Sequence, residues 1–116
     1  MKFSGRVIHG DGIGRQLGYP TANLDIAKAS LPLASGVYAC RVRVEDKTYD
    51  GSFVVRENPW KVEVHIIGYD GGNLYGRSIE GDVIEKISEL ENFFSRESLI
   101  EKIRSDVEKV KIFLKN

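Results

Sequence analysis

Alternating apolar and polar residues run through most of the chain between residues 3 and 87, and this alternation predicts β-strands. The clearest run covers residues 36–45. One face of it carries Tyr38, Cys40, Val42 and Val44, and the residues between them, two of which are arginines, form the other face. This two-residue period is typical of a half-buried strand. Weaker versions of the pattern predict further strands at residues 3–8, 21–26, 48–55, 60–67 and 74–87.

Several residues inside or between these segments predict local irregularities. Gly5 suggests a bulge or a close backbone approach in the first strand. Asp46 and Lys47 form a candidate two-residue turn between the two strands that flank them. The last strand can be bent or interrupted at Gly76 or Gly81, and residues 27–35 read as a connecting loop.

The period changes near the C-terminus and predicts one amphipathic helix from Ser95 onward. Ser95 is a suitable N-cap, and Glu97 lies in the first turn, where the helix dipole favours an acid. Lys111 and Lys115 lie near the other end, where a cation is favoured. The apolar stripe, which we expect to dock on the rest of the protein, consists of Leu99, Ile100, Ile103, Val107, Val110 and Leu114.

Five or six strands followed by one helix, without alternation of strand and helix, favour an antiparallel sheet that closes into a barrel. The length of 116 residues fits one domain, residues 1–116. Lysine plus arginine number 17, as do aspartate plus glutamate, and this balance gives no reason to expect a nucleic-acid partner. The lone Cys40 falls on the apolar face of its strand, so we expect a packed core thiol rather than a nucleophile.

No apolar run is long enough to span a bilayer, and the first residues do not resemble a signal peptide. We therefore expect a cytoplasmic protein without a membrane partner.

A glycine-rich segment at residues 9–23 carries the strongest functional signal. Glycines let main-chain N–H groups approach a ligand closely, so this segment could wrap a phosphate group. Its spacing matches neither the nucleotide-binding loop that ends in Lys-Ser or Lys-Thr nor the dinucleotide fingerprint. Taken alone, it could equally be a surface loop of a β-rich protein.

Thr21 and Asn23 close this segment at a spacing of two residues. In an extended backbone their side chains point the same way. A hydroxyl and an amide oxygen on one face are suitable ligands for a hard cation or a polar molecule.

Glu63 lies in the middle of a predicted strand, on the polar face that it shares with Lys61 and His65. One interpretation is a solvated strand face with ordinary charges. The other makes Glu63 a general base held on a rigid strand. His65 could itself be a base, or it could be a hydrogen-bond partner of Glu63 or a packed ring.

A set of motifs follows in a fixed order along nearly the whole chain. The most specific block is Gly14-Arg15-Gln16-Leu17-Gly18-Tyr19-Pro20-Thr21-Ala22-Asn23-Leu24. It is preceded by Gly5-Arg6-Val7 and His9-Gly10-Asp11. Later segments are Leu31-Pro32, Gly36-Val37-Tyr38-Ala39, Glu63-Val64-His65-Ile66, Leu74-Tyr75-Gly76-Arg77, and Phe93 with Ser95, Glu97, Ser98, Leu99 and Asp106. In residues and in order, these motifs resemble the riboflavin kinase family.

The resemblance implies a fold and an activity. The fold is dominated by β-structure: a six-stranded antiparallel, Greek-key-like barrel with a C-terminal helix. The implied activity is transfer of the γ-phosphate of ATP to the ribityl 5′-hydroxyl of riboflavin, which gives FMN, with Mg²⁺ as cofactor. ATP and riboflavin would then be the partners of a monomeric protein.

Carried over position by position, the resemblance also implies roles for individual residues. Thr21 and Asn23 would hold Mg²⁺, and Glu63 would accept the proton of the substrate hydroxyl. The nucleotide would be bound by Gly10, Gly12, Gly14, Arg15, Gly18, Pro20, Thr21 and Asn23.

The sequence departs from the family's pattern in segments that we expect to border the flavin rather than the nucleotide. Val54-Val55-Arg56 stands where many bacterial members read Asn-Ile-Gly. Gly68-Tyr69 replaces Asp-Phe, and Ser88 stands in the place of an arginine.

Two other functions remain as alternatives. One is a barrel that binds flavin or nucleotide without turnover, as a carrier or sensor. The other is an interaction module without a small-molecule site. FAD synthesis is not expected, because no nucleotidyltransferase segment is present in the sequence.

Overall fold

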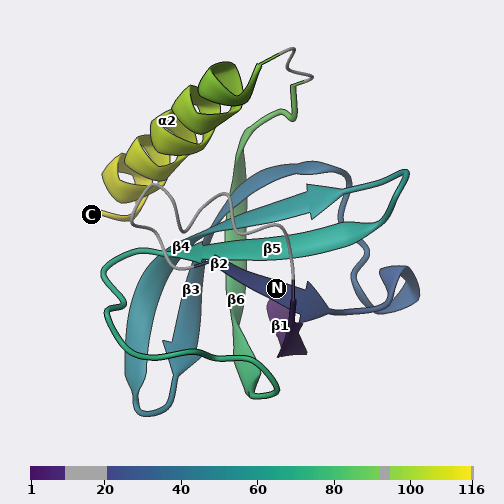
Figure 1. Ribbon diagram of the computed structural model, residues 1–116, viewed down its shortest axis with the longest axis vertical. Helices are drawn as coiled ribbons and strands as arrows, with labels where there is room; N and C mark the ends of the chain where they lie inside the picture. The colour runs from purple at the N-terminus through teal and green to yellow at the C-terminus, as the bar shows by residue number, and fades with distance from the viewer. Residues whose placement is uncertain (10–20, 92–94, 116) are drawn as a thin grey trace.

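Six antiparallel strands form a closed barrel in the computed structural model, which describes residues 1–9, 21–91 and 95–115 (Figure 1). Around the barrel the strands follow the order β1-β2-β5-β4-β3-β6, and β6 pairs with β1 to close it. The elements are β1 (Lys2–Ile8), β2 (Thr21–Asp25), the short 3₁₀ helix η1 (Lys28–Ser30), β3 (Gly36–Val44), β4 (Lys47–Arg56), β5 (Lys61–Ile66), β6 (Ser78–Ser88) and the helix α2 (Arg96–Leu114).

The connectivity is that of a Greek key. Strands β3, β4 and β5 follow one another as antiparallel neighbours, and β6 then returns to pair with β3 on its free side. Three consecutive strands with a fourth that lies beside the first define this motif. The predicted six-stranded Greek-key-like barrel with a C-terminal helix is therefore confirmed.

Two predicted boundaries were wrong. Val44 pairs with Lys47, so the turn of this hairpin is Glu45–Asp46 rather than Asp46–Lys47. Glu45 adopts a positive φ of 58°, which lets the chain reverse one residue earlier than the polar residues suggested.

The last strand begins at Ser78 rather than at residue 74. Gly76 has a φ of 81°, and a hydrogen bond from the Arg77 N–H to the Leu74 carbonyl closes a turn there. The predicted interruption at Gly76 is therefore confirmed as a turn, and the strand starts after it at Ser78. Gly81 instead lies within the continuous strand, where a Cβ atom would come within 2.1 Å of the Arg41 carbonyl oxygen.

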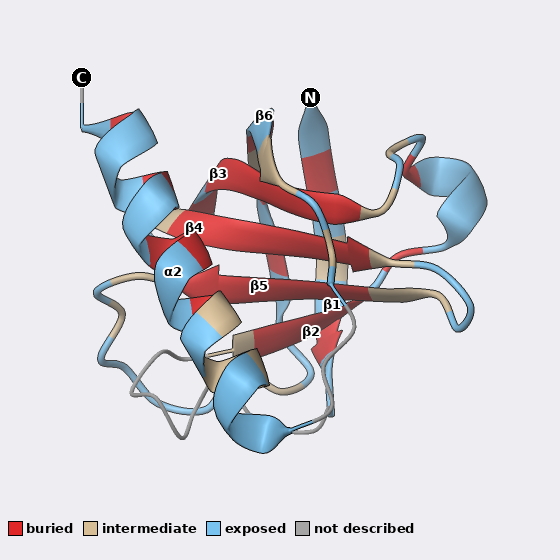
Figure 2. Cartoon of the chain, turned by 90° about the horizontal axis from the view of Figure 1, so that it is seen from above, coloured by how far each residue is buried: buried red, intermediate tan, exposed pale blue. Residues whose placement is uncertain are grey.

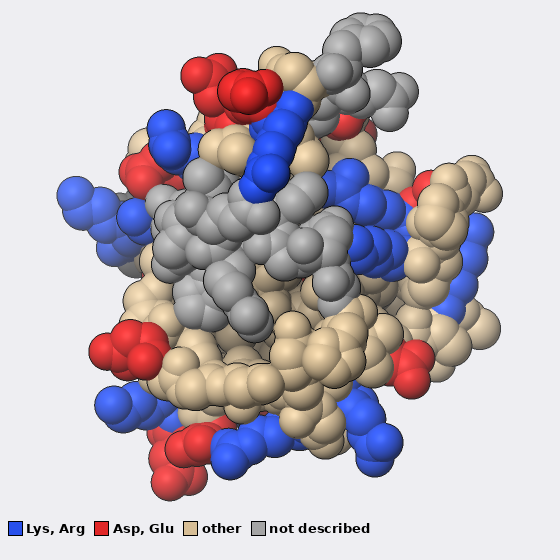
Figure 3. Space-filling model, viewed as in Figure 1, with Lys and Arg blue, Asp and Glu red and all other residues tan. Residues whose placement is uncertain are grey.

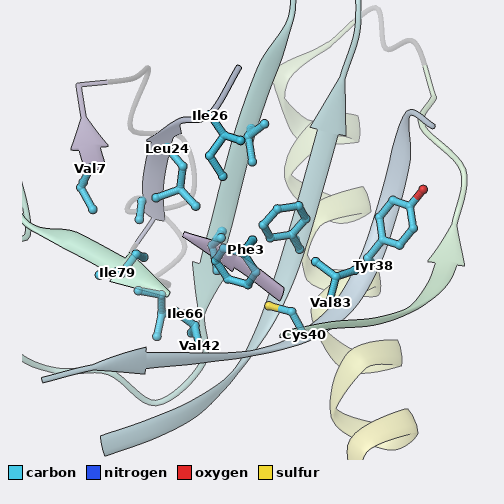
Figure 4. Packing of buried hydrophobic residues seen from close by; sticks show 14 of the residues in the cluster. Phe3, Val7, Leu24, Ile26, Tyr38, Cys40, Val42, Ile66, Ile79 and Val83 are labelled. Carbon is cyan, nitrogen blue, oxygen red and sulfur yellow. The ribbon is translucent and has the colours of Figure 1, made fainter. Parts of the chain in front are cut away.

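The barrel interior is filled by the apolar faces of all six strands (Figure 4). Phe3 and Phe53 pack there with ring centroids 4.7 Å apart. Cys40 lies in the same cluster with no exposed surface, which confirms the packed core thiol. Burial, with a smaller contribution from the nearby Asp50, raises the pKa of the Cys40 thiol far above its ordinary value.

Helix α2 begins as the sequence predicts. The Ser95 side chain accepts a hydrogen bond from the Ser98 N–H, with a donor–acceptor distance of 3.1 Å. Glu97 lies in the first turn and Lys111 in the last, so the charge at each end has the sign that the helix dipole favours there.

The helix packs on the outside of the barrel, against β3, β4 and β6 (Figure 2). Its C-terminal half closes a second, smaller apolar cluster in which Val110 and Leu114 cover Ala39. In the part of the chain that the structure describes, no helix is long and apolar enough to cross a membrane. Basic and acidic side chains are interspersed around the face shown in Figure 3.

Candidate active site

The candidate site lies on the outer face of the barrel, where β2 and β5 run side by side. Their register pairs Asn23 with Glu63 and Thr21 with His65. Because side chains alternate across a sheet, these four residues point outward, while their sequence neighbours fill the interior. The predicted common orientation of Thr21 and Asn23 is confirmed, and it brings both beside Glu63.

Glu63 is a buried carboxylate, only 5% exposed, so the interpretation as a solvated strand face is wrong for this residue. Its nearest cation is Arg56 on β4, whose Nε donates a hydrogen bond of 3.2 Å to Oε1. The Lys61 Nζ lies 4.0 Å from the same oxygen. A buried charge is costly unless it is paired, and these two cations supply the pairing.

Asn23 is equally buried, and its Oδ1 has no hydrogen-bond partner among the residues that the structure describes. A buried amide oxygen without a partner is rare in native proteins and often marks a bound ion, water or ligand. The atom lies on the strand next to Glu63, so the unsatisfied acceptor and the carboxylate share one small area.

His65 is packed rather than exposed, with only 3% of its surface accessible. Its Nδ1 lies 3.2 Å from the Thr21 Oγ1, within hydrogen-bond distance. The ring therefore helps to fix the position of the Thr21 hydroxyl. This contact favours the interpretation of His65 as a packed hydrogen-bond partner, although its partner here is Thr21 rather than Glu63.

Helix α2 covers a further set of polar groups on the same outer face. Lys102, held largely out of solvent, donates a hydrogen bond of 2.9 Å to the buried Asp106, and its ammonium group also contacts the Ser88 hydroxyl. These helix residues and the buried Ser52 and His65 line a small cavity between α2 and the sheet. This part of the outer face is therefore polar, and the helix α2 covers it.

A metal ion here would depend on hydroxyl and amide oxygens. Within residues 1–9, 21–91 and 95–115, no group of three or more His, Cys, Asp or Glu residues could hold a metal ion. Thr21 and Asn23 fit a hard cation, because Mg²⁺ prefers oxygen ligands and commonly takes few from the protein and the rest from phosphates and water. The Asn23 oxygen, which has no partner in the described part of the chain, agrees with this use.

The model of the Flavokinase family, described as riboflavin kinase, matches residues 1–114 of this chain. The chain belongs to the riboflavin kinase family. Among curated relatives, it is 39% identical over 96% of its length to a bifunctional riboflavin kinase/FMN adenylyltransferase of Buchnera aphidicola subsp. Schizaphis graminum. The enzyme of that name from Haemophilus influenzae is 34% identical over 97% of the chain. The chain spans 38% of the length of each of these two relatives.

Two solved structures are similar to this chain. The riboflavin kinase from Trypanosoma brucei superposes with a TM-score of 0.71 at 26% identity, covering 99% of this chain and 80% of that one. A Streptococcus pneumoniae structure described as a macrolide-efflux protein gives a TM-score of 0.83 at 28% identity. That match covers 95% of this chain and 38% of the other. The barrel with its C-terminal helix is therefore the riboflavin kinase fold.

Some of the residues that the family resemblance singled out meet in the structure, and others lie outside the described residues. Thr21, Asn23 and Glu63 are brought together on adjacent strands. The remaining predicted nucleotide-binding residues lie outside the described part of the chain, and their role stays a prediction: Gly10, Gly12, Gly14, Arg15, Gly18 and Pro20.

Three of the positions that depart from the family's pattern, Val54, Arg56 and Ser88, lie on or beside the same face. Val54 pairs with Glu63 across β4 and β5, and Arg56 contacts its carboxylate. Ser88 ends β6 and accepts a hydrogen bond from Lys102. Gly68 follows β5 with a φ of 83°. Whether these positions border the flavin stays a prediction.

Two residues of this face, Arg56 and Asp106, were not predicted from the sequence to belong to the site. Arg56 follows Ser52 and Val54 at steps of two along β4, and this alternation would have placed it on the outer side of the strand. Asp106 lies on the buried stripe of α2 between Ile103 and Val110, where a lone acid signals a partner on the covered surface.

Proposed function

We propose that this chain is an ATP-dependent riboflavin kinase, which transfers the γ-phosphate of ATP to the 5′-hydroxyl of riboflavin and gives FMN and ADP. The observation that carries the proposal is the position of the buried Glu63 opposite Asn23 on the neighbouring strand. The buried amide oxygen of Asn23 has no hydrogen-bond partner among the residues that the structure describes. Membership of the riboflavin kinase family and the names of the bifunctional relatives support the substrates.

Glu63 acts as the general base. As the 5′-oxygen of riboflavin forms its bond to the γ-phosphorus, the bond between that phosphorus and the ADP oxygen breaks, and Glu63 takes the hydroxyl proton. Phosphoryl transfer depends mainly on positioning and charge neutralisation, and one oriented acceptor for the proton completes the requirement. A carboxylate on a strand that is paired on both sides, as β5 is in this closed barrel, is a rigid acceptor.

Thr21 and Asn23 would hold Mg²⁺ beside the nucleotide phosphates. When bound, the ion neutralises the charge that develops on the transferred phosphoryl group. The hydrogen bond between His65 and the Thr21 hydroxyl supports this role, because it fixes the orientation of a ligand side chain from the neighbouring strand.

The glycine-rich segment completes the proposed site. Gly10, Gly12, Gly14 and Gly18 would cover the nucleotide phosphates through backbone N–H groups. Arg15 and Pro20 would also contact the nucleotide, through their side chains. The segment leads directly into β2, which carries Thr21 and Asn23. We further propose that the chain acts as a monomer in the cytoplasm.

The test is an assay of the purified chain with riboflavin, ATP and Mg²⁺, in which flavins are separated chromatographically and ADP is measured in parallel. We expect FMN and ADP in equal amounts, and no FMN when the metal is chelated. A folded chain that binds riboflavin or ATP without forming FMN would contradict the proposal and would favour a carrier or sensor.

A further inference from the structure

The contact between Arg56 and Glu63 joins two strands on the outer face of the barrel. Arg56 ends β4 directly opposite Lys61, the first residue of β5. From that position its guanidinium reaches back to the carboxylate of Glu63, 3.2 Å from Nε to Oε1.

We propose that Arg56 is a positioning residue for Glu63: by binding Oε1 it orients the carboxylate so that Oε2 meets the substrate hydroxyl. The inference rests on the proposed kinase function and adds a specific role for a residue outside the expected catalytic set. Arg56 acts through Glu63 and need not touch the substrate.

A carboxylate has two oxygens, and a general base uses one of them. The closest contact of both neighbouring cations, Arg56 and Lys61, is with Oε1. The side chain of Glu63 would otherwise rotate about its terminal torsion, which is broad. Holding one oxygen therefore selects one orientation for the other, and misplacement of a reacting group by about 1 Å can reduce a rate by roughly a hundredfold.

The two cations differ in what they can do for Glu63. The Lys61 Nζ is 4.0 Å away and acts as a point charge on a flexible chain, whereas the planar guanidinium of Arg56 is at hydrogen-bond distance. Arginine presents its donors in a fixed fork that matches carboxylate geometry, and lysine does not. Removal of Arg56 leaves the charge of Lys61 in place, so a loss of activity would report orientation more than charge.

The burial of the pair is asymmetric, which suits a positioning role. The Glu63 side chain is 6% exposed and the Arg56 side chain 35% exposed. The Glu63 carboxylate is therefore held within the buried part of the outer face. Arg56 reaches it from the edge of the cavity beneath α2, which Arg56 helps to line. A substitution of Arg56 changes the edge of the site without opening a hole in the barrel interior.

A matched control exists on β3. The Arg43 Nε donates to the Glu80 Oε1 over 3.3 Å, so the same type of bond joins adjacent strands far from the candidate site. Comparing Arg56→Met with Arg43→Met separates a role at Glu63 from the general loss of a cross-strand ion pair.

The experiment measures kcat and KM for riboflavin and ATP in the parent, Arg56→Met, Arg56→Lys and Arg43→Met. We expect Arg56→Met to lower kcat by roughly 10- to 100-fold, with KM for ATP within about threefold of the parent. Arg56→Lys should recover part of the loss, and Arg43→Met should match the parent. Thermal unfolding of each variant shows which of them remain folded.

A double variant decides whether Arg56 acts through Glu63. If it does, Arg56→Met combined with Glu63→Gln should be no slower than Glu63→Gln alone, because the group that Arg56 positions is already gone. Losses that multiply would overturn the inference. If Arg56→Met fails to fold, the same comparison with Arg56→Lys decides the question.

The outcomes also separate this inference from the proposed function. If the parent forms FMN and Arg56→Met keeps its kcat, only the role of Arg56 is wrong. If the folded parent forms no FMN, the kinase function and the role of Arg56 fall together.

Discussion

The two faces of β5 are almost equally buried and yet chemically opposite. On the interior face, Val62, Val64 and Ile66 have at most 1% of their surface exposed and pack into the barrel core. On the outer face, Glu63 and His65 are 5% and 3% exposed. One strand thus carries an apolar core on one side and a buried polar site on the other.

The difference shows how a small barrel can carry a buried polar site on its outer face and still keep an apolar core. The interior face stabilises the fold through apolar burial alone. Part of the outer face lies beneath the helix α2, where His65 lines a cavity. The polar groups of the outer face contact one another across strands: Arg56 with Glu63, and Thr21 with His65. Within the described part of the chain the Asn23 Oδ1 has no partner, and it marks the place where a ligand is expected.

The largest effect on the outer face should come from Glu63→Gln. This change keeps the size of the side chain and removes the proton acceptor, so we expect kcat to fall by about two to four orders of magnitude. Riboflavin binding, followed by flavin fluorescence, should survive. A variant with a near-normal rate would exclude Glu63 from the mechanism.

On the interior face, Ile66→Ala should affect stability instead of chemistry. Deleting a fully buried isoleucine side chain to alanine costs about 2–5 kcal/mol in free energy of unfolding. Denaturant unfolding measures this loss, and kcat per folded molecule should stay near the parent value. A selective loss of kcat without destabilisation would mean that the two faces are not separable.

A smaller effect is expected for Thr21→Ala, at the rim of the outer face. Loss of the hydroxyl should raise the Mg²⁺ concentration needed for half-maximal rate roughly tenfold, which corresponds to about 1.4 kcal/mol. Thr21→Ser keeps the hydroxyl and serves as the control. An unchanged metal dependence in the alanine variant would contradict the proposed role.

The smallest response should come from Cys40 on the interior side of β3. Because burial raises the pKa of its thiol, the thiol stays protonated at pH 8, and a thiol-specific reagent should leave the folded protein unmodified. Reaction is expected only after unfolding in denaturant. Stoichiometric labelling of the folded protein would show that the interior is open to solvent.

The sequence predicted the interior face well, because it depends on local periodicity. The alternation of Tyr38, Cys40, Val42 and Val44 identified the core side of β3, and the stripe with Ile103, Val107 and Val110 identified the docked side of α2. The Ser95 cap was likewise a local signal. The turn at Glu45–Asp46 was missed by one residue because alternation does not specify which residue adopts a positive φ.

The outer face could be predicted only in part, because it depends on contacts between segments that are distant in sequence. The spacing of Thr21 and Asn23 gave their common orientation, but the register that sets Asn23 beside Glu63 is a property of the closed barrel. The polar character of Glu63 suggested an exposed side chain, whereas in the fold it is buried. In the sequence, Arg56 stood out only as a departure from the family's pattern. Its contact with Glu63 could be seen only in the folded structure.

The most direct test of the central claim, that the outer face between β2 and β5 is the ligand site, is an NMR titration of the parent chain. Mg²⁺ and ADP are added first and riboflavin second, while the backbone amides and the Asn23 side-chain amide are followed. We expect the largest shifts at Thr21, Asn23 and Glu63. If saturating ligands leave these signals in place and shift residues elsewhere, such as the cavity near Lys2 and Glu80, the claim is wrong.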